Sequence, residues 1–363
     1  MPLHRVRIGS LILSFTKAAQ GRRTPKWTKS NLTFRFPMIR EMIRKHLIWQ
    51  TVGFFVLALL PQAANSARAS LYIRDFVIHY TDAEQTSQQD RDDATYQTWY
   101  DSNAANDLPS AFELGKKYLK EFPHGKYAAY LNKWVPATRA KLFNKAYGEH
   151  NSDAMISLAN EALVAEPDNL NYVITLALHL ITNELNVKPP DYTHAIEAET
   201  FTRRAVKLIE SGKKPANDPQ WNRKESLTYF YQVLGGIEER NKNSDKALEY
   251  YEKACRTDAE NALSFFSSGR IYQDRYQKAV ERFRAIPEAE RNAPMPRSQV
   301  KGLLEELTDA ADATIDRWVM FLKLTATNNT YGATRSQVEK TVAELYKYRH
   351  PDSPEGYQEL IKP

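Results

Sequence analysis

Small and large side chains recur at fixed spacing in the middle of this 363-residue chain. An aromatic residue, Leu and Gly are followed, after a polar stretch, by Ala, a second aromatic residue and a second Ala. These six residues fall at offsets 0, 3, 4, 16, 20 and 23, and they are Tyr231, Leu234, Gly235, Ala247, Tyr251 and Ala254. Spacings of three and four place residues on one helix face, so the pattern predicts two helices joined by a polar turn at residues 241–245. Gly and Ala allow two helices to cross closely, and the aromatic rings fill the gaps beside the crossing.

Neighbouring segments repeat this pattern less completely. Thirty-four residues downstream stand Phe265, Ser268 and Gly269, and we expect a second helix, reached by a shorter turn, to carry Ala279, Phe283 and Ile286. Upstream, Val173, Leu176 and Ala177 begin a helix whose partner spans residues 198–209, with an insertion containing Pro189 and Pro190 between the two. Residues 110–122, residues 126–147 and the segment around Ala162 and Pro167 predict further helices of the same kind.

The spacing resembles that of the tetratricopeptide repeat, a helical hairpin of 34 residues. The clearest match departs from the family pattern at its end, where Ala259 stands in place of the usual Pro. The resemblance implies an all-α fold, a right-handed α-solenoid of about five hairpins, because one hairpin cannot bury its apolar face alone. We expect these repeats over residues 94–287 and a C-terminal helical cap over residues 288–363, with helices at 298–324 and 336–348. An unrelated helical bundle is the alternative.

Residues 38–69 have the pattern of a secretory signal peptide. Arg40, Arg44 and Lys45 precede an uncharged apolar run over residues 47–60, and residues 67–69 supply a small-x-small cleavage pattern. A membrane anchor needs about 20 apolar residues, so this run favours a cleaved signal. We therefore expect a periplasmic or secreted protein cleaved near Ala69 and Ser70. An uncleaved membrane anchor is the alternative. If the signal peptide is cleaved, the protein contacts the membrane only transiently, through that peptide.

The stretches on either side of this signal are less regular. Residues 1–37 hold eight basic residues and no acid, which is typical of a transit peptide. A start at Met38 or Met42 would give an ordinary signal, so we interpret residues 1–37 as upstream sequence or a disordered leader. Residues 70–93 combine a β-branched and aromatic run at 71–80, expected to be a strand or an extended segment, with a polar linker.

The distribution of charge argues against nucleic acid as a partner. The whole chain has a formal charge of +6, which invites that interpretation. Residues 1–69 hold 12 basic residues and one acid, whereas residues 70–363 hold 38 basic and 43 acidic residues. The body therefore carries a net charge of −5, which is unfavourable for binding a polyanion.

No enzymatic motif stands out in the sequence. It has no G-x-G-x-x-G, phosphate-loop or G-x-S-x-G motif, and its histidines lack H-E-x-x-H spacing. We therefore expect no catalytic, cofactor-binding or metal-binding residues and no cofactor. His179 lies among apolar residues and is expected to be packed or at a groove edge. Cys255, the only cysteine, is expected to be a small buried residue.

In tetratricopeptide arrays, exposed positions of the first helix of each hairpin line a groove that holds a peptide or a helix. By the resemblance, the partner-binding positions here are Asn171, Leu178, Tyr229, Gln232, Glu239, Arg240, Phe266, Arg270, Gln273 and Asp274. Their mixture of aromatic, amide and oppositely charged groups suits a protein or peptide better than a polyanion.

The sequence thus predicts an exported, non-catalytic scaffold of tetratricopeptide type that binds a protein or peptide. One alternative is a membrane-anchored assembly factor with the same solenoid. The other is an enzyme whose site lies in the C-terminal helices or in the insertion with Pro189 and Pro190.

Overall fold

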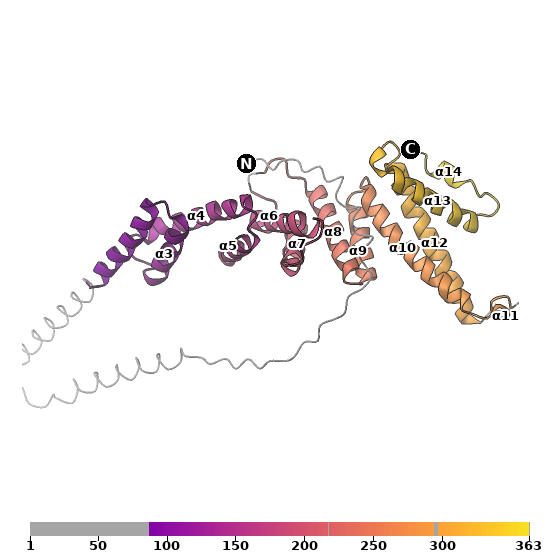
Figure 1. Ribbon diagram of the computed structural model, residues 1–363, viewed down its shortest axis with the longest axis horizontal. Coiled ribbons are helices and arrows are strands. Elements are labelled where there is room, and N and C mark those ends of the chain that lie inside the picture. Colours follow the sequence, from indigo (N-terminus) through magenta and orange to yellow (C-terminus); the bar gives the residue numbers. More distant parts are fainter. Residues whose placement is uncertain (1–86, 217, 294–296, 363) are drawn as a thin grey trace, which may run out of the picture. The chain divides into compact units, whose positions relative to one another are not determined.

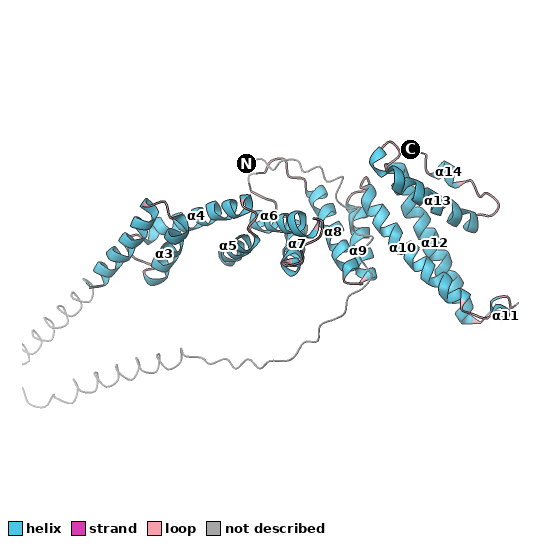
Figure 2. Ribbon diagram, in the orientation of Figure 1, coloured by secondary structure: helices cyan, strands magenta, loops and turns pink. Residues whose placement is uncertain are grey.

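The protein is all-helical throughout the part that its computed structural model describes, which comprises residues 87–216, 218–293 and 297–362. Helices and the turns between them account for these residues, and no strand occurs among them (Figures 1 and 2). The predicted leader, signal peptide and extended run at 71–80 lie outside the described residues.

The first described helix covers residues 87–104. The helices that follow are α3 (Leu108–Glu121), α4 (Ala128–Gly148), α5 (Ser152–Ala165), α6 (Leu170–Leu180), the π-helix η2 (Ile181–Leu185), α7 (Ala195–Glu210), α8 (Arg223–Arg240), α9 (Ser244–Thr257), α10 (Ala262–Arg284), α11 (Glu288–Arg291), α12 (Ser298–Leu324), the 3-10 helix η3 (Asn329–Tyr331), α13 (Gly332–Arg349) and α14 (Tyr357–Leu360). The helix predicted over residues 298–324 is confirmed at both ends.

Packing divides the chain into two compact units, Met1–Thr138 and Arg139–Pro363. In the described part of the first unit, helix 87–104, α3 and the start of α4 enclose a core centred on Trp99, Tyr118 and Leu131. The buried Asp92 carboxylate accepts hydrogen bonds from the Tyr118 hydroxyl and from the Lys126 backbone N–H, the latter at 2.9 Å. These bonds fix the turn between α3 and α4, because a buried carboxylate needs such donors.

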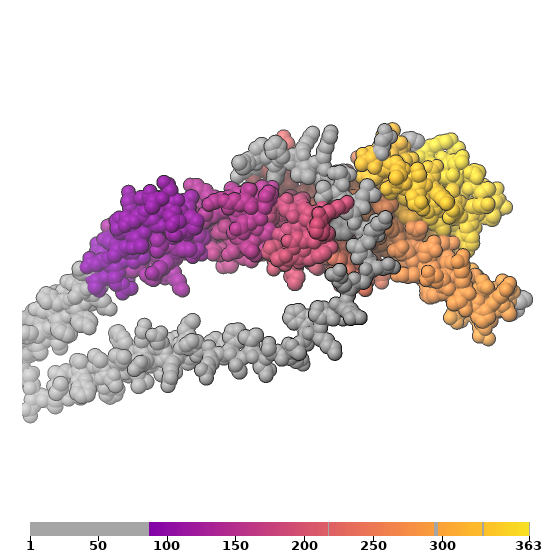
Figure 3. Space-filling view, in the orientation of Figure 1, coloured from indigo at the N-terminus to yellow at the C-terminus, as the bar shows by residue number. Residues whose placement is uncertain are grey.

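In the second unit, helices that follow one another in sequence pack against one another. Contacts join α5 to α6, α6 to α7, α7 to α8, α8 to α9 and α9 to α10. Next, α10 packs against α12, and α12 packs against α13. The C-terminal residues, yellow in Figure 3, lie against the orange α12. Each helix from α6 to α10 therefore packs against the helices before and after it in the sequence, with α12 taking the place of the short α11 beside α10.

Gly235 on α8 allows a close contact between α8 and α9. A Cβ atom on Gly235 would lie 2.5 Å from Cε1 of Tyr251, whose ring is buried on α9. No real Cβ fits at that distance, so the Tyr251 ring occupies the space that any other residue at 235 would need. The Gly and aromatic positions of the predicted hairpin thus meet in the structure.

The same contact recurs one step further along the chain. A Cβ on Gly269 of α10 would lie 2.4 Å from the buried ring of Trp318, which comes from α12. The Trp318 indole also donates to the carbonyl oxygen of Phe266 at 3.2 Å. The partner of α10 is therefore α12, a helix that starts fourteen residues after α10 ends.

The prediction of a short turn and a second helix after Gly269 is wrong. α10 runs without a break from Ala262 to Arg284 and includes both Ala279 and Phe283. Residues 270–284 contain no Gly, Pro or Asn, so nothing in this stretch ends the helix. The helix that packs beside α10 begins only after the prolines at 294 and 296.

Two neighbouring glycines of α8 provide a matched test of this packing. Gly235→Ala should lower the free energy of unfolding by about 1–3 kcal/mol, because the methyl group overpacks the contact with Tyr251. Gly236→Ala should leave it unchanged or raise it by up to about 1 kcal/mol through helix propensity. At Gly236 an added Cβ would meet only the Tyr251 hydroxyl, at 3.8 Å.

Urea denaturation followed by far-ultraviolet circular dichroism measures both variants. Equal stabilities of the two variants would contradict the close approach of α8 and α9 at Gly235.

Candidate functional site

The ten predicted partner-binding residues lie on α6, α8 and α10. Their exposure differs widely. Asn171 and Asp274 are exposed and Gln232 is buried; the others are partly buried, namely Leu178, Tyr229, Glu239, Arg240, Phe266, Arg270 and Gln273. Their role in binding a partner stays a prediction.

Glu239 and Arg270 are brought together by the packing of α8 against its neighbours. One guanidinium nitrogen of Arg270 lies 2.6 and 2.5 Å from the two carboxylate oxygens of Glu239. The hydroxyl of Tyr251 donates to the same carboxylate at 2.7 Å. The three side chains thus link α8, α9 and α10, so Glu239 and Arg270 have a structural role whatever else they bind.

Other predicted positions are also engaged within the chain. The Gln232 amide donates to Asn261 at 2.5 Å and to Ser264 at 2.8 Å. Burial raises the pKa of Tyr229 to about 12, which fits a ring packed against the apolar core. The Asn171 side chain accepts a hydrogen bond from the backbone N–H of Ala216 at 2.9 Å.

Arg240 differs from Arg270 in its partner. Its guanidinium carbon lies 4.7 Å from the ring centroid of Tyr192, which belongs to the insertion between η2 and α7. The Nε atom of Arg240 is buried without a hydrogen-bond partner. The ring of Tyr192 therefore covers one of the predicted binding residues with a cation–π contact.

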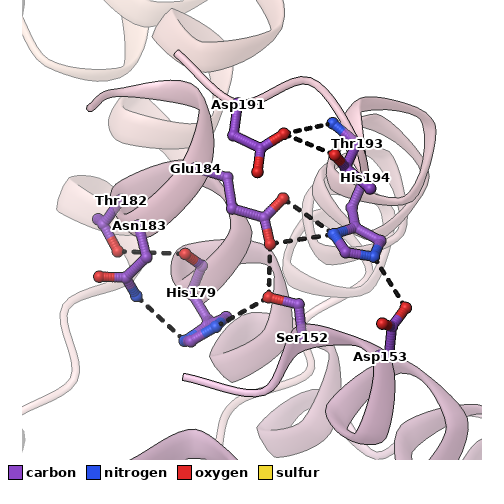
Figure 4. Close-up of polar contacts among 9 residues, drawn as sticks. All are labelled: Ser152, Asp153, His179, Thr182, Asn183, Glu184, Asp191, Thr193 and His194. Carbon is purple, nitrogen blue, oxygen red and sulfur yellow. Dashed lines mark hydrogen bonds and ion pairs between the residues drawn. The ribbon is translucent and has the colours of Figure 1, made fainter. Parts of the chain in front are cut away.

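A polar network that the sequence analysis missed lies beside this insertion (Figure 4). It contains two histidines, two carboxylates, one hydroxyl and one amide. We call it the His194 cluster, and its members are Ser152, Asp153, His179, Asn183, Glu184 and His194.

Helix ends bring these residues together. Ser152 and Asp153 begin α5, His179 lies near the end of α6, and His194 directly precedes α7. Asn183 and Glu184 lie on η2, where the backbone widens into a π-helix. Such π-helical turns are rare and often occur at functional sites.

The hydrogen bonds around Ser152 have a defined direction. The amide nitrogen of Asn183, which can only donate, lies 3.1 Å from Nδ1 of His179, so this ring carries its proton on Nε2. His179 Nε2 then donates to the Ser152 oxygen at 3.2 Å. Ser152 in turn donates to the Glu184 carboxylate at 2.5 Å. In this arrangement His179 is a donor to Ser152 and does not take its proton, unlike the base of a serine nucleophile.

His194 bridges the two carboxylates of the cluster. Its Nδ1 lies 3.0 Å from both oxygens of Glu184, and its Nε2 lies 3.1 Å from Asp153. Both ring nitrogens donate only in the imidazolium form, so this geometry selects the charged ring. Glu184 is nearly buried and gains its counter-ion from this ring.

The pKa values of the two histidines are shifted in opposite directions. Burial, with the neighbouring rings of His150 and His194, lowers the pKa of His179 below its usual 6.5. For His194, burial alone would lower the pKa, but the hydrogen bonds to Asp153 and Glu184 outweigh it and raise the pKa above 6.5. The cluster therefore favours a neutral form of the buried ring of His179 and a charged form of the bridging ring of His194.

Two residues that the sequence places inside the fold, His179 and Cys255, are buried in the structure. His179 is 1 % exposed, so its expected packed position is confirmed. Cys255 is buried, as expected, and burial raises the pKa of its thiol to about 11. Within the described residues, no group of three or more His, Cys, Asp or Glu side chains could hold a metal ion.

One sequence signal pointed toward the His194 cluster. The insertion with Pro189 and Pro190 is flanked by Glu184 and His194, ten positions apart. Ser152 and Asp153 lie more than thirty positions upstream of Glu184 or His194. The folding of the chain brings Ser152 and Asp153 next to Glu184 and His194. No spacing in the sequence reveals this contact.

No known protein-family model matches the sequence, and no curated protein matches it significantly.

The bridging role of His194 predicts a pH-dependent stability. Because the folded-state pKa lies above 6.5, the charged ring contributes stability that is fully present below pH 6.5 and lost as the pH rises through the raised value. His194→Gln should therefore lower the free energy of unfolding by about 1–3 kcal/mol at acidic pH, the usual worth of hydrogen bonds to charged groups. At alkaline pH the difference should be smaller, because the neutral ring keeps only one of the two hydrogen bonds and loses its charge.

Urea denaturation of both proteins over a pH series measures this difference. His124→Gln, at an exposed histidine of the first unit, is the matched control and should behave like the wild type. A loss of stability in His194→Gln that is the same at every pH would rule out the charged bridge.

Proposed function

We propose that this protein is an exported scaffold whose helical hairpins form a right-handed α-solenoid of tetratricopeptide type with a C-terminal helical cap. The observation that carries the proposal is the repeated contact of a glycine with a buried aromatic ring. Gly235 meets Tyr251 and Gly269 meets Trp318, and the two glycines are 34 positions apart, the length of the repeat. The packing of α5 to α10 in sequence order is also what a repeat array requires.

The proposed activity is the binding of a protein or peptide along α6, α8 and α10. These helices carry aromatic, amide and charged side chains of both signs at the predicted positions. Such a mixture matches a peptide, whose backbone and side chains offer donors, acceptors and apolar groups together. The net charge of −5 over residues 70–363 disfavours a polyanion.

The proposed location is the periplasm or the cell exterior. Support comes from the signal pattern at residues 38–69, which lies outside the described residues. Separately from this proposal, none of the helices in the described ranges combines the length and the hydropathy of a membrane span. An assembly factor that keeps residues 47–60 as an anchor is the alternative.

A photo-crosslinking residue at a predicted binding position, compared with one at an exposed control position, tests the binding proposal. With benzoylphenylalanine at Gln273 of α10, the partner should be captured in intact cells, because Gln273 is a predicted binding position. The same residue at Glu249, an exposed position of α9, should capture little of that partner.

Mass spectrometry of the crosslinked products identifies the partner and its contact segment. Equal capture from Gln273 and Glu249, or capture from Glu249 alone, would overturn the proposed binding face.

N-terminal sequencing of the protein isolated from its host tests export. The expected result is a start near Ser70, because the pattern at residues 67–69 is that of signal cleavage. A protein that retains residues 47–60 and fractionates with membranes would favour the anchored alternative.

A further inference from the structure

The insertion at residues 186–193 crosses from the end of η2 to the start of α7, and its own hydrogen bonds order it. The Asn186 N–H donates to the carbonyl oxygen of Ile181 at 2.9 Å, and the Asp191 N–H donates to that of Glu184 at 3.0 Å. The Asp191 carboxylate accepts bonds from the backbone N–H and the hydroxyl of Thr193 (Figure 4). We call residues 186–193 the strap.

The strap places a ring over a predicted binding residue. Tyr192, half exposed itself, lies against the guanidinium of Arg240 at the end of α8. No carboxylate forms an ion pair with Arg240 within the described part of the chain, in contrast to Arg203 and Arg270, which pair with Glu238 and Glu239. The cation is therefore held by an aromatic ring, a weaker contact than a partly buried ion pair.

The strap is followed directly by His194, the residue that bridges two carboxylates. The charged ring ties this end of the strap to Glu184 on η2 and to Asp153 on α5. A neutral imidazole has one N–H only, so loss of the proton removes one of these bonds and the attraction to both carboxylates. The end of the strap next to Tyr192 is then held less tightly.

We propose that residues 186–193 form a strap that covers Arg240 through Tyr192 and that the charged form of His194 holds closed. As the pH rises, His194 loses its proton, the strap loosens and Arg240 becomes free to bind the carboxylate or another acceptor of a peptide. The proposal thereby adds regulation to the proposed peptide binding, on which its consequence for Arg240 depends.

Titratable groups on each element packed around His194 set the direction of this switch. Asp153 on α5, Glu184 on η2 and Asp191 on the strap are anionic neighbours that favour the charged ring. His179 on α6 lies close enough to interact with His194, but burial lowers its pKa and so favours its neutral form. His150 stacks on His179, with ring centroids 5.8 Å apart. The effect of the carboxylates on the His194 pKa is larger than that of burial and of the neighbouring histidine. The strap is therefore closed at pH values below the pKa of His194.

Nuclear magnetic resonance of the purified protein without any partner tests the strap directly. With ¹³C-labelled arginine, the side-chain protons of Arg240 should show an upfield ring-current shift from Tyr192 at pH 5.5, and this shift should be lost at pH 8.5. The loss should follow the titration of the His194 ring. Arg240→Lys assigns the signal.

Three variants test whether the strap causes the pH dependence of the Arg240 shift. Tyr192→Ala should abolish the upfield shift at both pH values, and His194→Gln, which mimics the neutral ring, should reduce it at pH 5.5 to its value at pH 8.5. His124→Gln should leave the pH profile unchanged. Circular dichroism confirms that each variant keeps its helices.

An Arg240 shift that stays constant while His194 titrates, or that persists in His194→Gln at pH 5.5, would overturn the switch. Because the measurement uses the free protein, it does not depend on whether a peptide binds. If the strap depends on pH but α6, α8 and α10 bind no peptide, the result would contradict the proposed function and still support the proposed strap.

Discussion

The packing of the second unit depends on how closely one helix can approach the next. A helix with one apolar face gains stability only by burying that face, and depth of burial depends on side-chain size at the crossing. At Gly235 and Gly269 the absence of a Cβ lets a tyrosine and a tryptophan lie directly against the backbone. Both rings are buried, so each contact removes a large apolar surface from water. These two contacts set how closely α8 approaches α9 and how closely α10 approaches α12.

Helix packing also creates the polar site, because it fixes where helix ends meet. The start of α5, the end of α6 and η2 converge beside the start of α7, and the side chains there form the His194 cluster. A buried carboxylate such as Glu184 is costly without donors, and here Ser152 and His194 supply them. The cluster thus stabilises the junction of three helices, and it also makes that junction sensitive to pH. The proposed strap uses this sensitivity.

The sequence predicted the helices well where local signals were strong. The helix over residues 298–324 and the hairpin around Gly235 appear in the structure as the spacing indicates. The misplaced turn after Gly269 shows the limit of the 34-residue period: residues 270–284 lack a helix breaker, and α10 continues to Arg284. The pairing of Glu239 with Arg270 and the covering of Arg240 by Tyr192 depend on side chains from different helices. No spacing along one helix reveals them, and the same holds for the bridge from Asp153 to His194.

A double-mutant cycle on Gly235 and Tyr251 tests the central claim most directly, namely that an aromatic ring fills the space left by a glycine at the helix crossing. If it does, Tyr251→Leu should relieve part of the penalty of Gly235→Ala, because the smaller side chain leaves room for the added methyl group. The expected coupling in the free energy of unfolding is about 1–2 kcal/mol, as for residues in direct contact. Additive effects, within about 0.5 kcal/mol, would show that the two residues do not touch and would contradict the account.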